Sequence, residues 1–385
     1  MNPVQSKALR FVVMMGVVSL FADWAYEGAR SITGPYLAML GANGTMVGII
    51  AGFGELAGYG LRLASGYISE KTEKFWPITL LGYFIQMLAV PLLALAGNWQ
   101  VAALLIVAER MGKAIRNPPK SVMLAHAGEV MGQGWAFGIN EALDQLGACA
   151  GPLMVAAVLA HKGDYKTALL MLLIPAVMTM ALIVVARLLY PRPEDLHAKH
   201  MPDLQSKGLP RRFWVYLAGA AFVAAGFPDF ALMSYHWGKT GVVSSTLIPV
   251  SYALAMGASG LGSLIFGKLF DRQGLRILIP LTLVTILSVP LAFMGGMAGA
   301  FLGCMLWGLG MGVHESIIPA AVAAMGSPDR RASAYGIFTA GYGVAWFLGS
   351  AILGLCYDTS LPALISFSLI TECVAVFFLW HVSKA

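Results

Sequence analysis

Charged residues are scarce in this chain of 385 residues: they make up 11% of it, whereas an ordinary soluble domain carries about 25%. Hydrophobic residues make up 58% of the chain, and runs of more than about 18 apolar residues recur. These features exclude an ordinary soluble protein and indicate membrane-spanning helices. The net charge of +6 does not indicate a nucleic-acid partner, because the basic residues gather in alternate loops.

Cysteine is also scarce, and several motifs are absent. The four cysteines all lie in apolar segments without a pairing pattern, so we expect no structural disulfides. The chain lacks the G-x-x-x-x-G-K-S/T motif that holds nucleotide phosphates, which argues against an ATP-driven pump and leaves no cofactor to expect. It also lacks H-E-x-x-H and G-x-S-x-G, so we do not expect an enzyme.

The apolar runs predict an all-α membrane protein with twelve transmembrane helices. The predicted spans are 11–38, 46–68, 76–97, 100–125, 134–160, 166–189, 212–236, 243–270, 275–295, 299–325, 332–356 and 361–382. The largest interruption, over residues 191–210, is rich in proline and mixed charge. We therefore predict an amino-terminal six-helix bundle over 1–190, a linker over 191–210 and a carboxy-terminal six-helix bundle over 211–385.

The basic residues also predict the orientation. They crowd the two ends, the 191–210 region and every second loop, while 40–45 and 97–99 carry no charge. By the positive-inside rule, both termini and the linker are cytoplasmic.

The two halves repeat each other at an offset of about 200 residues. Gly66 to Lys71 matches Gly267 to Arg272, and Gly151 matches Gly349. An even number of spans in each copy predicts two parallel repeats related by an axis along the membrane normal.

With these features the chain resembles the major facilitator superfamily over essentially its whole length. That family has the pattern G-x-L-x-D-R/K-x-G-R/K in the loop after its second span. Residues 267–276 fit this pattern closely, whereas residues 66–74 have Glu70 for the aspartate and Glu73 for the second glycine. The resemblance implies alternating access and gating loops, and we assign the loop role to Gly66, Glu70, Lys71, Gly267, Asp271 and Arg272.

Two further stretches extend the resemblance. Residues 147–152 are similar to the family's G-x-x-x-G-P motif of exporters, although small-residue helix packing explains them equally well. Residues 21–30 and 314–316 are similar to bacterial permeases of unassigned substrate. The resemblance implies a monomer in the bacterial inner membrane.

Charged residues inside the amino-terminal spans are the candidates for ion handling, because a charge at mid-bilayer costs roughly 2.5–3.5 kcal/mol. They form stripes at helical spacing on spans one, two, four and five. For proton coupling we single out Asp23, Glu27, Glu141 and Asp144. As cavity charge partners we single out Arg30, Arg62, Arg110, Lys113, Arg116 and Lys120. A structural salt-bridge network is the alternative interpretation.

The candidates for substrate binding are polar and aromatic groups, mostly in the second half. They are Trp24, Tyr59, Asp229, His236, Trp307, His314, Glu315 and Tyr342. Together these features predict a secondary active transporter that moves a small molecule by proton coupling, with export favoured. One alternative is transport of a metal ion or chelate through Asp23, Asp229, His236, His314 and Glu315. Another is a sensor or scaffold that transports nothing.

Overall fold

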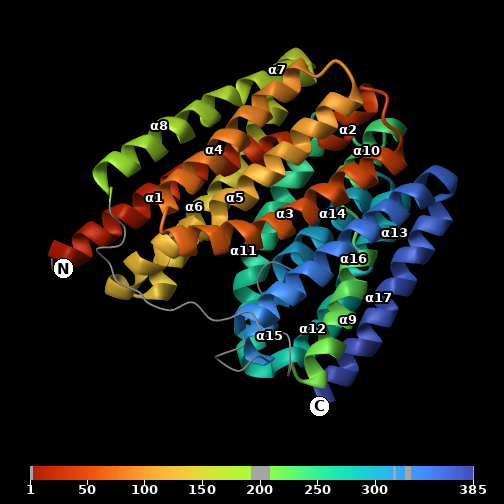
Figure 1. Cartoon of the computed structure of the whole chain (residues 1–385). Coiled ribbons are helices and arrows are strands. Elements are labelled where there is room, and N and C mark those ends of the chain that lie inside the picture. Colours follow the sequence, from red (N-terminus) through yellow and green to blue (C-terminus); the bar gives the residue numbers. More distant parts are fainter. Residues whose placement is uncertain (1–2, 192–208, 315–317, 326–330, 385) are drawn as a thin grey trace. The chain divides into compact units, whose positions relative to one another are not determined.

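The computed structural model describes residues 3–191, 209–314, 318–325 and 331–384. Every regular element in these ranges is a helix, and Figure 1 shows that long helices make up almost all of the described chain. Nine helical stretches of the described part are long and apolar enough to cross a membrane. The all-α, multi-pass membrane class predicted from the sequence is therefore confirmed, while the count of twelve spans stays a prediction.

The helices gather into two compact units. Unit 1 is Met1–Arg30 with Ala57–Met201, and unit 2 is Ser31–Leu56 with Pro202–Ala385. The elements of unit 1 are α1 (Pro3–Arg30), the second half of α3 (Gly44–Thr72), α4 (Phe75–Leu92), η1 (Leu93–Leu95), α5 (Trp99–Met131), α6 (Gln133–Lys162), α7 (Tyr165–Met171) and α8 (Leu173–Leu189). Most of the predicted linker 191–210 lies outside the described residues.

Unit 2 contains the remaining elements. They are α2 (Thr33–Met39), the first half of α3, α9 (Arg211–Gly226), α10 (Phe230–Thr240), α11 (Leu247–Gln273), η3 (Gly274–Ile277), α12 (Leu278–Thr285), α13 (Ser288–Met294), α14 (Gly296–Gly312), α15 (Ile318–Met325), α16 (Arg331–Thr359) and α17 (Leu361–Lys384). Residues 31–56 thus pack with the carboxy-terminal half, although the whole of Ala57–Met201 lies between them in the sequence.

Small residues explain why residues 31–56 pack in this way. A β-carbon on Gly34 would lie 2.5 Å from the backbone nitrogen of Tyr235, and one on Gly48 would lie 3.1 Å from the α-carbon of Gly354. Gly52 similarly touches Phe347 and Ser350. Only glycine allows backbones to approach so closely, as in other membrane helix pairs.

Asp358, at the end of α16, binds the start of α3 in the same region. Its carboxylate accepts hydrogen bonds from the backbone nitrogens of Gly44 (2.9 Å) and Thr45 (2.7 Å) and from the Thr45 hydroxyl (2.7 Å). These are the unpaired donors of a helix start, and a carboxylate there also meets the positive end of the helix dipole. The cap of α3 is therefore shared: the end of α16 supplies Asp358, and the preceding segment supplies Asn43, whose Oδ1 accepts from the backbone nitrogen of Met46 at 2.8 Å.

Replacing Asp358 with alanine is expected to lower the stability by about 1–2 kcal/mol, the usual value of an N-cap. It should also loosen residues 31–56, because the three bonds that join the start of α3 to α16 are lost, while the bond from the Tyr235 hydroxyl to the carbonyl of Ala42 (3.2 Å) remains. We would measure thermal unfolding, and the rate of thiol labelling of an Ala42→Cys probe in a chain whose native cysteines are replaced.

Asp164 provides the matched control. It makes the same kinds of bonds, to the backbone nitrogens of Lys166 and Thr167 and to the Thr167 hydroxyl, but at the start of its own helix α7. The bonds from Thr167 hold the pKa of Asp164 below its usual range. Asp164→Ala should cost similar stability without faster labelling at position 42. Equal labelling rates in the two variants would contradict the proposed fastening.

The internal repeat is visible in the packing of each unit. Gly151 of α6 lies against the backbone of α1 at Trp24 and Gly28, and its counterpart Gly349 of α16 lies against the backbone of α9 at Ala225. The loop copies also both have a positive φ at the matching position: 55° at Glu73 and 61° at Gly274. The positive φ is therefore kept although glycine is lost in the first copy, and a non-glycine residue with positive φ costs about 1–2 kcal/mol.

Candidate functional site

The buried charges of unit 1 converge on α5. Lys113, Arg116 and Lys120 lie along one stripe of this helix, and Arg116 is only 1% exposed. Pro118 and Pro119 interrupt the helix beside them, and a proline at 119 leaves the carbonyl of residue 115 without its helical donor. The hydroxyl of Ser65 donates to that carbonyl at 2.6 Å, so the irregularity is satisfied by α3.

Each cation of the stripe faces a predicted carboxylate. Arg116 Nη2 lies 3.3 Å from Asp23 Oδ1, and Lys113 Nζ lies 3.8 Å from Glu27 Oε1, both acids being on α1. Lys120 Nζ lies 3.9 Å from Oδ1 of Asp144 on α6. The stripes predicted on spans one, four and five therefore do meet, as three ion pairs with most of their atoms buried.

Arg116 also has partners on α4 that the sequence analysis did not name. Its Nε donates to Gln86 Oε1 at 2.6 Å, and its Nη1 donates to the Tyr83 hydroxyl at 3.1 Å. Gln86 Nε2 in turn donates to Oε1 of Glu109 at 2.9 Å. The signal was present, because Thr79, Tyr83 and Gln86 repeat at the same i, i+4, i+7 spacing that identified Asp23, Glu27 and Arg30.

Glycines hold α4 and α5 close enough for these bonds. A β-carbon on Gly82 would lie 2.6 Å from the backbone nitrogen of Arg116, and one on Gly112 would lie 2.6 Å from that of Gln86. The two helices thus cross at Gly82 and Gly112, next to the residues that bridge them.

The ring of Tyr26 lies beside three cations of the cluster, Lys113 among them. Lys113 Nζ lies 4.1 Å from the centre of its ring, and the guanidinium carbons of Arg110 and Arg30 lie 5.6 and 5.9 Å away. Arg30 also donates to the Tyr26 hydroxyl at 3.0 Å, and Arg110 lies 3.7 Å from Glu109. Cation–π contacts of this kind are strongest where water is excluded.

Asp144 is held more loosely than Asp23. Its Oδ1 has no hydrogen-bond partner among the described residues, and its Oδ2 accepts a long bond of 3.4 Å from Asn140. Lys120 donates at the same time to the hydroxyl of Ser19, whose own proton goes to Asn140 Oδ1 at 3.3 Å. Ser19 and Asn140 therefore complete a small polar ring around this acid.

The other candidates of unit 1 make separate contacts. Glu141 is exposed and accepts a bond of 3.1 Å from Gln145. Arg62 lies 5.4 Å from the ring centre of Tyr59. Trp24 is half-buried and donates to the sulfur of Met154 at 3.1 Å.

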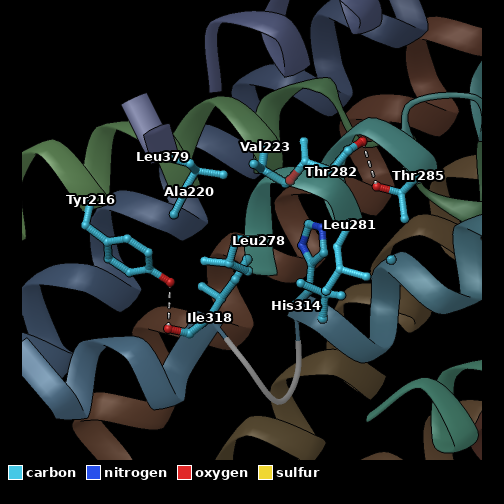
Figure 2. A pocket seen from close by; sticks show the side chains of 12 residues that line it. Tyr216, Ala220, Val223, Leu278, Leu281, Thr282, Thr285, His314, Ile318 and Leu379 are labelled. Atoms are coloured by element: carbon cyan, nitrogen blue, oxygen red, sulfur yellow. Dashed lines mark hydrogen bonds between the residues drawn. The ribbon is translucent and has the colours of Figure 1, made fainter. Parts of the chain in front are cut away.

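In unit 2, His314 lies beside a small cavity between α9, α12, α14, α15 and α17 (Figure 2). Its Nδ1 shares a short hydrogen bond with the Tyr342 hydroxyl, and its ring lies 4.5 Å from that of Phe227. The cavity volume is about 10 Å³, which is room for about one water molecule. Two of the predicted binding residues, His314 and Tyr342, are therefore in contact, whereas Glu315 lies outside the described residues.

The other candidates of unit 2 do not gather around His314. Asp229 caps α10 by accepting from the nitrogen of Ala231 at 3.2 Å, and His236 bonds the Tyr357 hydroxyl at 3.1 Å. Trp307 is fully buried and donates to the carbonyl of Pro228 at 2.8 Å, so it offers no surface to a ligand in this state. The described residues contain no group of three or more metal-ligating side chains, and nothing here favours the metal alternative.

The loop candidates lie at the ends of long helices. Glu70 and Lys71 are exposed in the last turn of α3, and Asp271 and Arg272 are exposed in the last turn of α11. Gly66 lies in ordinary contact with Pro118 of α5, whereas a β-carbon on Gly267 would meet open space. Their gating role stays a prediction.

Comparison with known proteins identifies the fold. Residues 12–380 match the sequence model of the Major Facilitator Superfamily. The chain belongs to this superfamily. It is therefore a multi-pass membrane transporter and not an enzyme, and the family works on small-molecule substrates.

Relatives and solved structures agree with this assignment. An uncharacterized protein of Mycobacterium tuberculosis is 41% identical, with 97% of this chain and 93% of the relative covered. An uncharacterized MFS-type transporter of Methanocaldococcus jannaschii is 25% identical, with 91% and 89% covered. The nucleoside transporter NupG shares the fold with a TM-score of 0.72 at 15% identity, over 100% of this chain and 99% of that one. A bacterial homologue of the lysosomal transporter Spinster, crystallised inward-facing and unoccupied, has a TM-score of 0.70 at 15% identity, over 100% and 96%.

Proposed function

We propose that the protein is a proton-coupled secondary transporter of the cell membrane, with both termini in the cytoplasm, and that Asp144 binds the coupling proton. The observation that carries this proposal is the loose environment of Asp144, which has a Lys120 contact of 3.9 Å and no hydrogen bond to Oδ1 among the described residues. A carboxylate with few hydrogen bonds and a distant cation loses little stabilisation when it is neutralised, so it binds a proton most readily. Asp23, by contrast, faces Arg116 at 3.3 Å.

Protonation of Asp144 would then change the charge balance of the cluster. A neutral Asp144 no longer attracts Lys120, which keeps its bond to Ser19 of α1. The stripe of α5 would thereby carry one uncompensated positive charge between α1 and α6. Asp23 and Glu27 are the acids left to share it, and we propose that this redistribution moves α1 and α5 during alternating access.

The packing of residues 31–56 supports an orientation of unit 2 in the membrane. The uncharged loop 40–45, which the positive-inside rule places outside the cell, is joined to the carboxy-terminal half through Asp358 and Tyr235. We propose that this end of unit 2 faces the outside of the cell.

Export is the proposed direction, and its support is the resemblance of residues 147–152 to the exporter motif. Gly147 and Gly151 touch the backbone of α1, so packing alone accounts for the glycines. An assay in vesicles of known orientation therefore decides the direction.

The test begins with a stability screen of the purified protein against small organic molecules at acidic and alkaline pH. A compound that raises the unfolding temperature is then followed into proteoliposomes with and without an imposed pH gradient. We expect wild-type protein to accumulate it only with the gradient. Asp144→Asn should keep the thermal shift but reduce gradient-driven accumulation at least tenfold.

Glu129→Asn, at an exposed acid of α5, is the control and should behave like wild type. Accumulation that ignores the pH gradient, or that survives in each of Asp144→Asn, Asp23→Asn and Glu27→Gln, would refute proton coupling through this cluster.

A further inference from the structure

Glu372, in the middle of α17, is a buried acid that the ion pairs of unit 1 do not involve. It is 2% exposed, and its Oε2 has no hydrogen-bond partner in the described part of the chain. It occupies the stripe of α17 that otherwise packs into the core of unit 2, with Ser368, Ala375 and Leu379 on the same stripe. A glutamate therefore stands where the helix pattern requires an apolar side chain.

The side chain lies where the seventh predicted span is broken. Helix α9 ends at Gly226 and α10 begins at Phe230, and a β-carbon on Gly226 would lie 3.0 Å from Cγ of Glu372. The helix end leaves carbonyls without helical donors, and the hydroxyl of Ser368 donates to that of Gly226 at 2.7 Å. The indole nitrogen of Trp307 donates a hydrogen bond of 2.8 Å to the carbonyl of Pro228. Discontinuous membrane helices of this kind are sites where transporters bind ions.

Among the described residues, the helices packed around α17 bring no lysine or arginine to this level. The titratable groups that they and α17 carry, besides Glu372, are Arg211, Arg212 and Tyr216 of α9, Arg276 of η3, Arg331, Tyr335, Tyr342, Cys356, Tyr357 and Asp358 of α16, and Cys373, His381 and Lys384 of α17. His314, which follows α14, packs against Phe227 next to the break and bonds the Tyr342 hydroxyl. α12 and α13 carry none.

Helix geometry separates the cations from Glu372. Arg212 precedes Gly226 by 14 residues and Lys384 follows Glu372 by 12, which at 1.5 Å per residue is about 21 and 18 Å. The nearest charged neighbour along the break is Asp229, which is itself an acid and caps α10. A negative charge on Glu372 would be repelled by Asp229. It would also be repelled by the carboxyl end of α9, which is the negative end of that helix dipole.

We propose that Glu372 is a second proton-binding site of this transporter, located at the break between α9 and α10. An ionised carboxylate without a cation is very unfavourable in a buried site, whereas the neutral acid needs no counter-charge. Binding of a proton converts one form into the other, and release requires water or a cation to reach the break. The site differs from Asp144, whose carboxylate has Lys120 beside it, and it does not depend on the coupling role of Asp144.

Infrared spectroscopy of the purified protein tests the proposal directly, because protonated carboxyl groups absorb apart from ionised ones. At neutral pH, wild type minus Glu372→Gln should show a carboxylic-acid band, whereas wild type minus Glu129→Gln should show none. The band should shift in D₂O and disappear as the pH is raised. If Glu372→Gln does not fold, Glu372→Asp serves instead and should move the band to a new frequency.

Three results would overturn the proposal. Absence of the band at neutral pH would mean that Glu372 is ionised, and a rise in unfolding temperature with NaCl over KCl that Glu372→Gln abolishes would identify a sodium site instead. A band that neither shifts in D₂O nor changes up to alkaline pH would show a permanently neutral structural acid. A thermal-stability series completes the test: because the folded protein binds a proton that the unfolded chain releases, wild type should lose stability relative to Glu372→Gln as the pH rises.

Discussion

Replacing Arg116 with alanine is expected to lower the stability by about 3–5 kcal/mol, the usual cost of removing one partner of a buried ion pair. The arginine is 1% exposed and binds Asp23, Gln86 and Tyr83 on two different helices. Without it, the Asp23 carboxylate is left in the core with its nearest cation gone. Unfolding of the purified protein in detergent, by heat or by denaturant, measures the loss.

We attribute most of this loss of stability to the Asp23 carboxylate that is left without its cation, and a double variant tests that cause. Arg116→Met with Asp23→Asn removes both charges and should recover part of the stability lost by Arg116→Met alone. Arg187→Ala, at an exposed arginine of α8, should change stability by no more than about 0.5 kcal/mol. Equal losses in the single and double variants would mean that Arg116 contributes packing and not charge compensation.

The sequence predicted the helical class, the membrane location and the charged stripes because each depends on local periodicity. Apolar runs of span length predict helices whatever surrounds them, and i, i+4, i+7 spacing places Asp23, Glu27 and Arg30 on one face. The partners across helices were harder to predict. Which acid faces which cation depends on helix crossings at Gly82, Gly112 and similar contacts, whose register no single helix reveals.

Two features of the structure were outside the reach of pattern reading. Residues 31–56 pack with the carboxy-terminal half, although the sequence repeat assigns them to the other one. Glu372 was overlooked because it stands alone: one acid in an apolar span has no spacing to another charge, and only burial and the neighbouring helix break distinguish it. Isolated charges in predicted spans therefore merit the same attention as stripes.

Gly151→Ala is expected to destabilise the protein by about 2–3 kcal/mol, although it adds a single methyl group. The added β-carbon would collide with the carbonyl of Trp24 and would lie 2.8 Å from the backbone nitrogen of Gly28. Both obstacles are backbone of α1, so no side chain can rotate away, and the whole of α1 must move from α6. Because α1 carries Asp23 and Glu27, the same shift should also weaken their pairing with α5.

Gly138→Ala on the same helix is the matched control. A β-carbon there meets nothing within 4 Å, so the only effect is the better helix propensity of alanine, worth up to about 1 kcal/mol of stabilisation. The two variants should therefore shift the unfolding temperature in opposite directions. Gly349→Ala extends the test to unit 2, since its β-carbon would meet the backbone of Ala225 as that of Gly151 meets α1. If Gly151→Ala were as stable as Gly138→Ala, the close crossing of α1 and α6 would be wrong, and with it the placement of Asp23 and Glu27 beside α5.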